Sequence, residues 1–328
     1  MSIEKTVLAD DLEICRILNG MWQVAGGHGQ IETDSAIADM EKYQSGGFTT
    51  WDLADIYGPA ESLIGEFKRK IGHEKFQALT KFVPNPGPMS NSIVTHYIEQ
   101  SLQKMDTDCI DLLQFHWWDY NDTSYLDALN VLSKLQSENK IKHVGLTNFD
   151  TERVKIMKEQ GYEIVSNQVQ YSILDQRPDN LMASLFAKHG IKILSYGTLL
   201  GGFFSEKYLE VDEPHRGDLV TSSLQKYKNM IDVWGGWQLF QELLSALNEI
   251  AKKHNCSIAN VATRFVLDKP QVAGVIIGAR LGIAEHRDDN AKVFNVKLDQ
   301  QDISLISSIS AKANDLFEVI GDCGEEYR

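Results

Sequence analysis

The stretch Phe48-Thr49-Thr50-Trp51-Asp52 is a short apolar run that ends at a carboxylate. Two later stretches have the same form: Phe76-Gln77-Ala78-Leu79-Thr80 leads to Lys81, and Ile110-Asp111-Leu112-Leu113-Gln114-Phe115 leads to His116. Such runs predict buried strands. In a barrel of parallel strands the carboxyl ends meet on one face, where such barrels do chemistry. The three polar side chains are therefore expected to lie together.

Helical and strand-like patterns alternate from about Gly20 to the end of the chain, which is typical of βα units and a parallel sheet. Eight strands are predicted, at 17–21, 48–52, 77–81, 110–116, 143–146, 164–168, 192–196 and 272–277. This pattern predicts a (β/α)₈ barrel, also called a TIM barrel. Two short apolar stretches within residues 6–16 predict an additional β-hairpin. Because no stretch resembles a linker, residues 1–328 are expected to form a single domain.

The alternation breaks once, between Gly201 and Gly236, where no strand or helix period is clear. A long irregular insert in a compact domain is usually a lid or a binding loop. It follows the seventh predicted strand, so this loop is expected to lie over the catalytic face.

Composition excludes several classes of function. The 328 residues carry 32 basic and 46 acidic side chains, a net charge of −14, which argues against nucleic acid and anionic membranes as partners. Four cysteines are scattered without metal-ligand spacing, so reduced thiols and no metal site are expected. The first residues contain no apolar signal, and no apolar run approaches membrane-spanning length. A cytoplasmic protein is the resulting expectation.

A tyrosine, Tyr57, follows Asp52 by five residues and completes a chemically coherent set. A lysine ammonium beside a tyrosine favours the phenolate, and a carboxylate can hold that lysine in place. Tyr57 could then donate a proton near neutral pH, with Lys81 and Asp52 tuning it. His116 could fix a substrate oxygen by a hydrogen bond from its neutral ring. Taken singly, each residue has a structural explanation; together they predict a carbonyl reductase.

Five ordered motifs resemble those of the aldo-keto reductase superfamily. DLADIYGPAE at 52–61 is similar to D-T-A-x-x-Y-G-x-[SA]-E, with Leu53 replacing threonine, and LTK and LQFHW contain Lys81 and His116. IKHVGLTNF at 141–149 resembles I-R-x-[IV]-G-[VL]-S-N-F. LLGGFFSEKY at 199–208 resembles L-x-G-G-L-L-T-G-K-Y. The resemblance implies a barrel plugged by the hairpin and reduction of small aldehydes or ketones with NADPH, or with NADH.

The resemblance also implies cofactor contacts. Thr147, Asn148 and Gln168 would bind the nicotinamide carboxamide, although the first two could instead cap the next helix, and Tyr196 would stack on the nicotinamide ring. Other contacts would come from turns at the strand ends and from Asp52, namely Gly20, Met21, Trp22, Gly197, Leu199, Gly201, Gly202 and Lys207. Trp22, Tyr57, His116, Trp117 and Trp118 are predicted to form an apolar substrate pocket.

The C-terminal motif departs from the family. GAR at 278–280 and EHRDDN at 285–290 resemble the adenosine-binding run G-A-[SR]…Q/R-x-x-E-N, but with two extra residues. Arg280 and Arg287 are candidates for a 2′-phosphate, since a guanidinium matches phosphate geometry. The same run assigns four further residues to the cofactor, with Asn290 reading the adenine: Gly278, His286, Asp289 and Asn290.

Two other classes of function fit part of the pattern. A barrel glycosidase could use Asp52, Asp55 and Glu61, but it gives no role to Lys81 or Tyr196. A nicotinamide-binding redox sensor or channel-subunit-like interaction protein would keep the cofactor residues and show only incidental turnover. No G-x-G-x-x-G or P-loop motif follows a strand. The sequence leaves the oligomeric state open.

Overall fold

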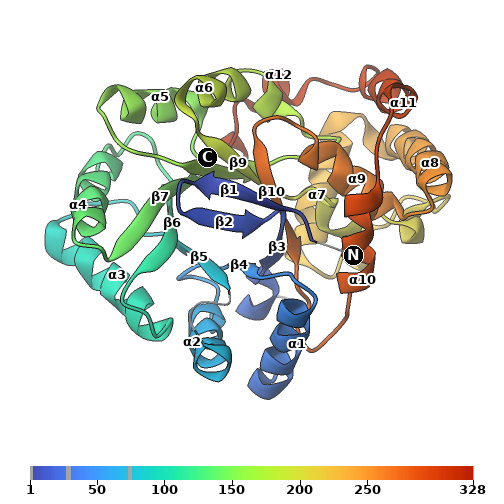
Figure 1. Cartoon of the computed structure of the whole chain (residues 1–328). Helices are drawn as coiled ribbons and strands as arrows, with labels where there is room; N and C mark the ends of the chain where they lie inside the picture. Colours follow the sequence, from blue (N-terminus) through green and yellow to red (C-terminus); the bar gives the residue numbers. More distant parts are fainter. Residues whose placement is uncertain (1–2, 27–30, 73–75, 328) are drawn as a thin grey trace.

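The computed structural model describes residues 3–26, 31–72 and 76–327, and its centre is a closed barrel of parallel strands (Figure 1). The strands are paired in the order β10-β3-β4-β5-β6-β7-β8-β9. Their bounds are β3 (Ile17–Gly20), β4 (Thr50–Asp52), β5 (Gln77–Phe82), β6 (Ile110–His116), β7 (Ile141–Thr147), β8 (Ser166–Gln170), β9 (Lys192–Tyr196) and β10 (Val272–Gly278). All eight predicted strands are therefore confirmed, with shifts of up to two residues at their ends.

Helices surround the barrel (Figure 1). They are α1 (Thr33–Ser45), α2 (Ala60–Ile71), α3 (Asn91–Lys104), α4 (Tyr125–Ser137), α5 (Thr151–Glu159), α6 (Met182–His189), α7 (Ser222–Trp234), α8 (Gly236–His254), α9 (Ile258–Leu267), α10 (Arg287–Lys292), α11 (Gln300–Ser310) and α12 (Leu316–Ile320). Side-chain caps fix several starts: Ser90 accepts a hydrogen bond from the N–H of Ile93, and Asp150 accepts one from Arg153. Helix α5 is thus capped by Asp150, and the alternative reading of Thr147 and Asn148 as caps is wrong.

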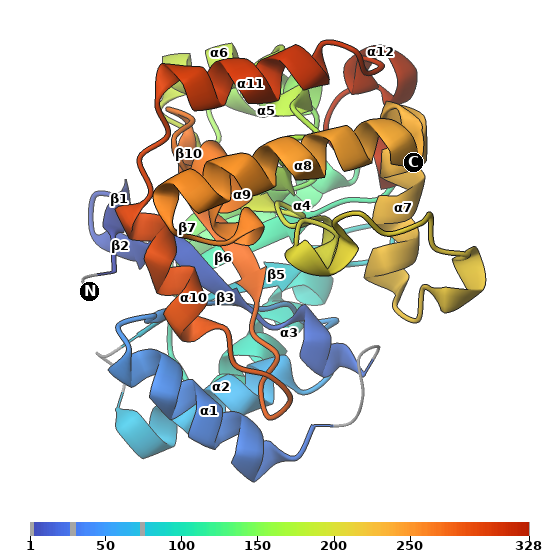
Figure 2. The same cartoon turned by 90° about the vertical axis from the view of Figure 1, so that its right-hand side faces the viewer.

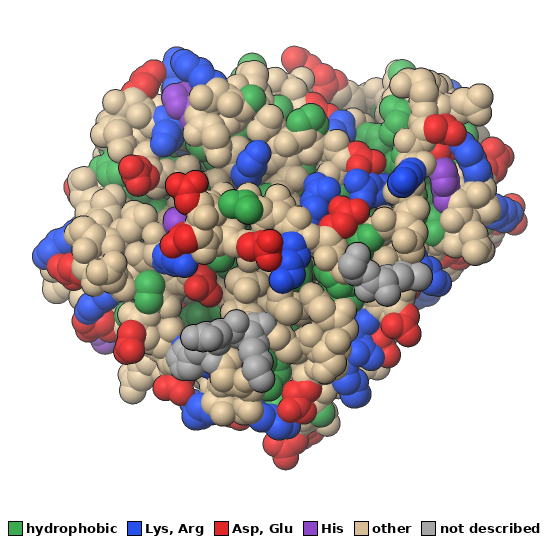
Figure 3. Space-filling view, in the orientation of Figure 1, with side chains coloured by type: hydrophobic (Ala, Val, Ile, Leu, Met, Phe, Trp, Pro, Cys, Tyr) green, Lys and Arg blue, Asp and Glu red, His purple; other side chains and the backbone are tan. Residues whose placement is uncertain are grey.

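The predicted hairpin consists of β1 (Lys5–Ala9) and β2 (Leu12–Cys15), which pair antiparallel across one end of the barrel (Figure 1). Its buried side chains join an apolar cluster inside the barrel, formed by Leu8, Leu12, Ile14, Leu18, Leu79, Leu112, Leu194 and Ala273. Figure 3 shows this end with acidic and basic side chains interspersed on its surface. Because the hairpin closes the amino-terminal ends of the strands, the polar strand ends lie at the opposite face.

The segment 201–236 differs from the prediction, because much of it is helical. The 3₁₀ turns η4 (Leu200–Gly202), η5 (Glu206–Tyr208) and η6 (Arg216–Asp218) precede α7. Several of its side chains are buried in the main core, including Phe203, Phe204, Met230 and Ile231. Figure 2 places α7 and the C-terminus at the side of the molecule away from the hairpin. The segment is therefore a mostly helical insertion that packs against the core at the end of the barrel opposite the hairpin.

Candidate active site

The four residues predicted to be catalytic come together at the carboxyl ends of β4, β5 and β6. The ammonium Nζ of Lys81 lies 2.7 Å from Oδ2 of Asp52 and donates a second bond of 3.0 Å to the carbonyl of Leu53. The same ammonium lies 4.8 Å from the ring centre of Tyr57, which is half-buried in the turn after β4. His116 ends the neighbouring strand β6 and is buried.

The Lys81–Asp52 pair is almost completely buried, which sets its electrostatics. Burial lowers the pKa of Lys81, and the charge and hydrogen bond of Asp52 oppose that change. A buried ion pair of this kind is stable only when its remaining lone pairs are also satisfied. Asp52 meets this condition: its Oδ1 accepts from the side-chain amides of Gln114, at 3.0 Å, and Gln168, at 2.7 Å.

His116 is held in one orientation by its Nδ1, which lies 3.0 Å from the carbonyl oxygen of Thr147. A carbonyl only accepts, so Nδ1 carries the proton, and a neutral ring then has no proton on Nε2. A neutral His116 with this tautomer accepts at Nε2, and its role in orienting the substrate oxygen stays a prediction. Donation from Nε2 requires the imidazolium form.

Four of the five residues predicted for the substrate pocket pack in two edge-on pairs, and the fifth lies in the core. Trp22 and Trp118 are 41% and 37% exposed, Trp22 packs edge-on against Tyr57, and Trp118 packs edge-on against His116. Trp117 is fully buried, and its indole N–H donates to backbone carbonyls at Asp119 and Asp122. The assignment of Trp117 to the pocket is wrong, because its ring packs into the core beside Phe115.

The predicted carboxamide-binding residues lie side by side, with Thr147 at the end of β7, Asn148 directly after it and Gln168 in the middle of β8. The hydroxyl oxygen of Thr147 is buried and has no hydrogen-bond partner among the described residues, which suits a ligand amide. Asn148 has a left-handed backbone, with φ of 58°, and its Oδ1 accepts a 2.8 Å bond from the hydroxyl of Tyr196. The ammonium of Lys226, on α7, lies 5.2 Å from the ring centre of Tyr196. Sequence reasoning did not single out Lys226.

Two glycines are required by close packing. Gly20 pairs with Gly278 in the barrel, and a Cβ at Gly20 would lie 2.8 Å from the side chain of Ile276. Gly197 has φ of 72°, and a Cβ there would overlap the hydroxyl of Tyr227 on α7. Both therefore let backbone and side chains approach closely.

The remaining predicted turn residues differ in their burial and contacts. The backbone N–H of Met21, whose side chain is buried, donates to the carbonyl of Asp52. After β9, Leu199 is half-buried before η4, where Gly201 is exposed and Gly202 is half-buried. Lys207 is exposed in η5, with its ammonium over Tyr208.

The predicted adenosine-binding residues gather after β10 and at the start of α10. Arg280 is exposed, whereas the Nε of Arg287 donates a 2.8 Å bond to the carboxylate of Glu285. The carboxylate of Asp289 is bonded within the protein, since it accepts a 2.8 Å hydrogen bond from the hydroxyl of Ser257. His286 is exposed, and Asn290 is buried.

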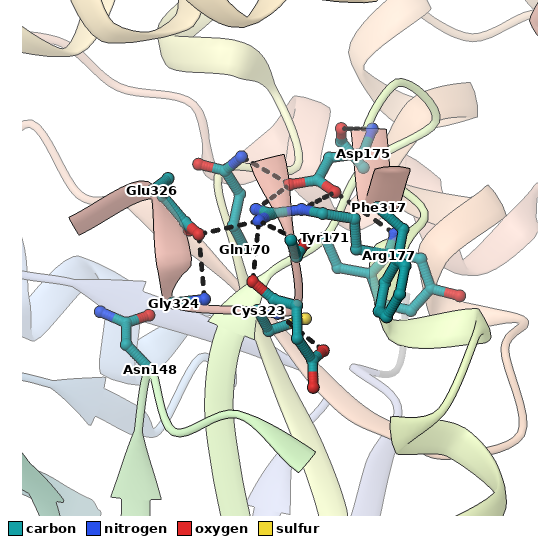
Figure 4. A network of polar contacts seen from close by, with 12 residues as sticks. Asn148, Gln170, Tyr171, Asp175, Arg177, Phe317, Cys323, Gly324 and Glu326 are labelled. Atoms are coloured by element: carbon teal, nitrogen blue, oxygen red, sulfur yellow. Dashed lines mark hydrogen bonds and ion pairs between the residues drawn. The ribbon is translucent and has the colours of Figure 1, made fainter. Parts of the chain in front are cut away.

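The C-terminal segment after α12 is tied to the same face by Arg177, in the 3₁₀ turn η3 (Arg177–Asp179) (Figure 4). Its guanidinium, 1% exposed, makes two 2.8 Å bonds to Asp175. It also lies 3.0 Å from Glu326 and 3.1 Å from the carbonyl of Asp322. Burial opposes the charge of Arg177, but the hydrogen bond and charge of Asp175, with the charge of Glu326, outweigh it and raise its pKa.

Two of the three carboxylates of the glycosidase alternative, Asp52 and Glu61, have partners elsewhere in the protein. Glu61 accepts a 2.8 Å bond from the hydroxyl of Thr80 and lies 3.4 Å from the ammonium of Lys104. Asp52 is paired with Lys81. Asp52 and Glu61 are thus engaged in separate contacts, and Glu61 links α2 to β5 and α3.

Two further features concern only the part of the chain that the structure describes. Within it, no three His, Cys, Asp or Glu side chains are grouped so that they could bind a metal ion. No helix in the same ranges is both long and apolar enough to cross a membrane.

A parallel barrel with a tyrosine, a buried lysine–aspartate pair and a histidine at the carboxyl ends of its strands has the parts of a carbonyl oxidoreductase. A sequence profile of the Aldo/keto reductase family matches residues 16–311, and the chain belongs to this family. It is therefore an NAD(P)H-dependent oxidoreductase that acts on carbonyl compounds.

Named relatives are distant. The NADH-specific methylglyoxal reductase of Escherichia coli (strain K12) is 23% identical over 327 residues, which cover 92% of this chain and 96% of that protein. Flagellar radial spoke protein 5 of Chlamydomonas reinhardtii is 27% identical over 257 residues, covering 66% of this chain and 49% of that protein, so the match spans about half of its length.

Solved structures share the fold. A glycerol dehydrogenase from Gluconobacter oxydans superposes with a TM-score of 0.79 at 21% identity, covering 96% of both chains. A thermostable aldo-keto reductase, solved with the inhibitor epalrestat, gives a TM-score of 0.72 at 22% identity and covers 94% of this chain and 100% of that one.

Proposed function

We propose that this chain reduces aldehydes or ketones to alcohols, with NADPH as the cofactor and Tyr57 as the proton donor. The position of the Lys81 ammonium, bound to Asp52 and 4.8 Å from the ring centre of Tyr57, carries the proposal. A cation at this place stabilises the phenolate, so the hydroxyl of Tyr57 becomes a stronger acid. When bound, the cofactor supplies the hydride for the carbonyl carbon; Tyr57 supplies the proton for the oxygen.

Other residues orient the reactants in this proposal. His116 donates from Nε2 to the substrate oxygen in its imidazolium form, because Thr147 holds the proton at Nδ1. Thr147, Asn148 and Gln168 bind the carboxamide, and Tyr196 stacks on the ring. The exposed faces of Trp22 and Trp118 support an apolar carbonyl substrate beside Tyr57.

Replacing Tyr57 tests the acid role. Tyr57→Phe keeps the ring and removes the proton, so kcat for carbonyl reduction should fall roughly a hundredfold to ten-thousandfold, as for other general acids. Cofactor affinity, measured by quenching of protein fluorescence, should change little. Tyr162→Phe, which removes a hydroxyl bonded to Asn130 outside the site, should keep the normal rate. Near-normal turnover of Tyr57→Phe would refute the assignment.

The choice between NADPH and NADH depends on two arginines. Arg280 and Arg287 are proposed to bind the 2′-phosphate, and the exposure of Arg280 supports this role. NADH is the second candidate, because Glu285 occupies the guanidinium of Arg287 at 2.8 Å and would repel a phosphate. A relative named as NADH-specific is consistent with the second candidate.

Paired variants separate these two candidates. If the arginines bind the 2′-phosphate, replacing both with Ala should weaken NADPH about tenfold to a hundredfold, the cost of a few hydrogen bonds to a charged group, and leave NADH nearly unchanged. Glu285→Gln should strengthen NADPH alone, because it releases Arg287. An equal loss of both cofactors in the double variant would assign the arginines to the fold or to the pyrophosphate.

A further inference from the structure

Gln114 occupies an unusual place for an amide. It lies in β6 two residues before His116, so alternation along the strand places both side chains on the same face. Leu112, two residues earlier, belongs to the apolar cluster inside the barrel, so this face is the interior one. Gln114 is 0% exposed, and its backbone is in register with Lys81 on β5. An amide buried at this depth must be hydrogen-bonded.

The hydrogen bonds of Gln114 close a triangle. Its Nε2 donates to Oδ1 of Asp52 at 3.0 Å, and its Oε1 accepts from Nε2 of Gln168 at 2.7 Å. Gln168 donates its second N–H to the same Oδ1 of Asp52, at 2.7 Å. Both N–H groups of Gln168 are therefore used within the protein. Its carbonyl oxygen is the atom that remains for the amide of a ligand.

This arrangement gives Gln114 a role that packing does not require. Methionine has a similar volume, and the next layer of the barrel, two residues earlier on each strand, is built from Leu79 and Leu112. Without the acceptor on Gln114, the amide of Gln168 would have only Asp52 to fix it and could turn its N–H groups toward the ligand. A network of this kind is also cooperative, because each bond polarises the next.

We propose that Gln114 is a positioning residue that couples the recognition of the nicotinamide carboxamide at Gln168 to the Asp52–Lys81 ion pair. This inference rests on the proposed function. It adds that one buried amide fixes both the orientation of Gln168 and the second oxygen of Asp52. Cofactor binding and the acidity of the site are then set by the same contact.

Gln114→Met, which conserves volume, tests the coupling by binding. The ligand is whichever of the two oxidised dinucleotides, NAD⁺ or NADP⁺, the wild type binds more tightly. Its matching fragment without nicotinamide is ADP-ribose or 2′-phospho-ADP-ribose. The measured quantity is the ratio of the affinities for the dinucleotide and for the fragment. We expect the dinucleotide to weaken about threefold to tenfold, the value of one or two hydrogen bonds, and the fragment to bind as before. The matched control is Asn19→Leu, which removes a buried amide that donates 2.9 Å to the carbonyl of Phe48. It should lower stability and keep the wild-type ratio.

Gln114→Glu tests the same contact by pH. A protonated glutamic acid donates one bond to Asp52 and accepts one from Gln168, so it reproduces both contacts of the glutamine. Its ionised form places a second carboxylate against Asp52, which is unfavourable. The affinity ratio of this variant should therefore be near the wild-type value in mild acid and fall as pH rises to about 9. The wild-type ratio should change much less over this range.

These experiments distinguish two kinds of failure. A wild-type protein that binds the dinucleotide no more tightly than the fragment would contradict the proposed nicotinamide site itself. A clear nicotinamide contribution in the wild type that is unchanged in Gln114→Met and independent of pH in Gln114→Glu would overturn the role of Gln114 alone. Equal weakening of dinucleotide and fragment would also overturn it, since that result indicates a general structural defect.

Discussion

Asp55 is the clearest case of a single side chain whose ionisation the fold opposes. One of its carboxylate oxygens accepts a 3.1 Å bond from the N–H of Val83, and the other is buried without a hydrogen-bond partner in the described part of the chain. Burial raises the pKa of Asp55 to about 6; the bond from Val83 lowers it in part, and the charge of Glu61 adds to the increase. The folded state therefore binds a proton that the unfolded chain releases.

This shift gives a pH-dependent contribution to stability. The pKa of Asp55 rises from 3.8 to about 6 on folding, so the free energy of unfolding should decrease as pH rises through that window. Asp55→Asn keeps an acceptor for Val83 and removes the charge. It should stabilise the protein at pH 7 by about 3 kcal/mol, from about 1.4 kcal/mol per pKa unit over the rise from 3.8 to about 6, and have little effect at pH 4. Urea unfolding at both pH values measures this; the same effect at both would contradict the assignment.

The sequence predicts the catalytic residues better than their partners. Asp52, Lys81 and His116 stand at strand ends, where position alone suggests a site, whereas Gln114 lies inside a strand and looks like an interruption of an apolar run. Gln114 lies two residues before His116 on the same strand, and this spacing could have indicated that both side chains face the site. The burial of Trp117 and the proton on Nδ1 of His116 depend on backbone direction at one residue, which a motif does not specify.

At the scale of elements, α7 shows why the segment 201–236 was predicted to be irregular. Its apolar residues Leu224, Tyr227, Ile231 and Trp234 follow helical spacing, and Thr221 caps the start by accepting from the N–H of Leu224. Polar residues between them hide this period. The barrel strands are short and flanked by turns, so their limits are read easily from sequence. A helix inserted between a strand and the next regular helix lies outside the βα alternation, so that alternation does not predict it.

Helix α7 contacts the turn after β9, so we expect this segment to respond to cofactor binding. Tyr227 packs against Gly197 and Gly201, and the exposed stretch 210–218 has few buried side chains. Adding NADPH should slow amide hydrogen exchange across Leu200–Gly202 and Glu206–Tyr208, because close ligand contacts restrict local opening. Exchange in 210–218 should remain fast and serves as an internal control. No change at 200–208, together with protection at Asn148 and Gln168, would exclude the lid role proposed for this segment.

At the scale of the whole molecule, the two ends of the chain lie at opposite ends of the barrel. The N-terminal hairpin covers the amino-terminal side through Leu8, Leu12 and Ile14. The C-terminal segment reaches the opposite face, where Arg177 binds it through Glu326 and backbone carbonyls (Figure 4). The hairpin was predicted from its alternation. The C-terminal contact was not, because it pairs residues 149 positions apart (326 minus 177) that no local pattern connects.

Removing Arg177 should therefore weaken the whole fold. Among the described residues, Arg177→Met leaves the buried Asp175 carboxylate with Gln170 as its one close side-chain partner. The free energy of unfolding should therefore fall by about 3–5 kcal/mol, as when one member of a buried pair is lost. Glu326→Gln retains an acceptor for Arg177 and should cost about 1 kcal/mol. Lys312→Met removes an exposed partner of Glu242 and should cost less than about 1 kcal/mol. Urea unfolding followed by circular dichroism measures all three. If Arg177→Met were no more destabilising than Lys312→Met, the C-terminal segment would be held by its apolar contacts, with Cys323 and Leu316 buried in the main core, and the ion cluster would serve orientation alone.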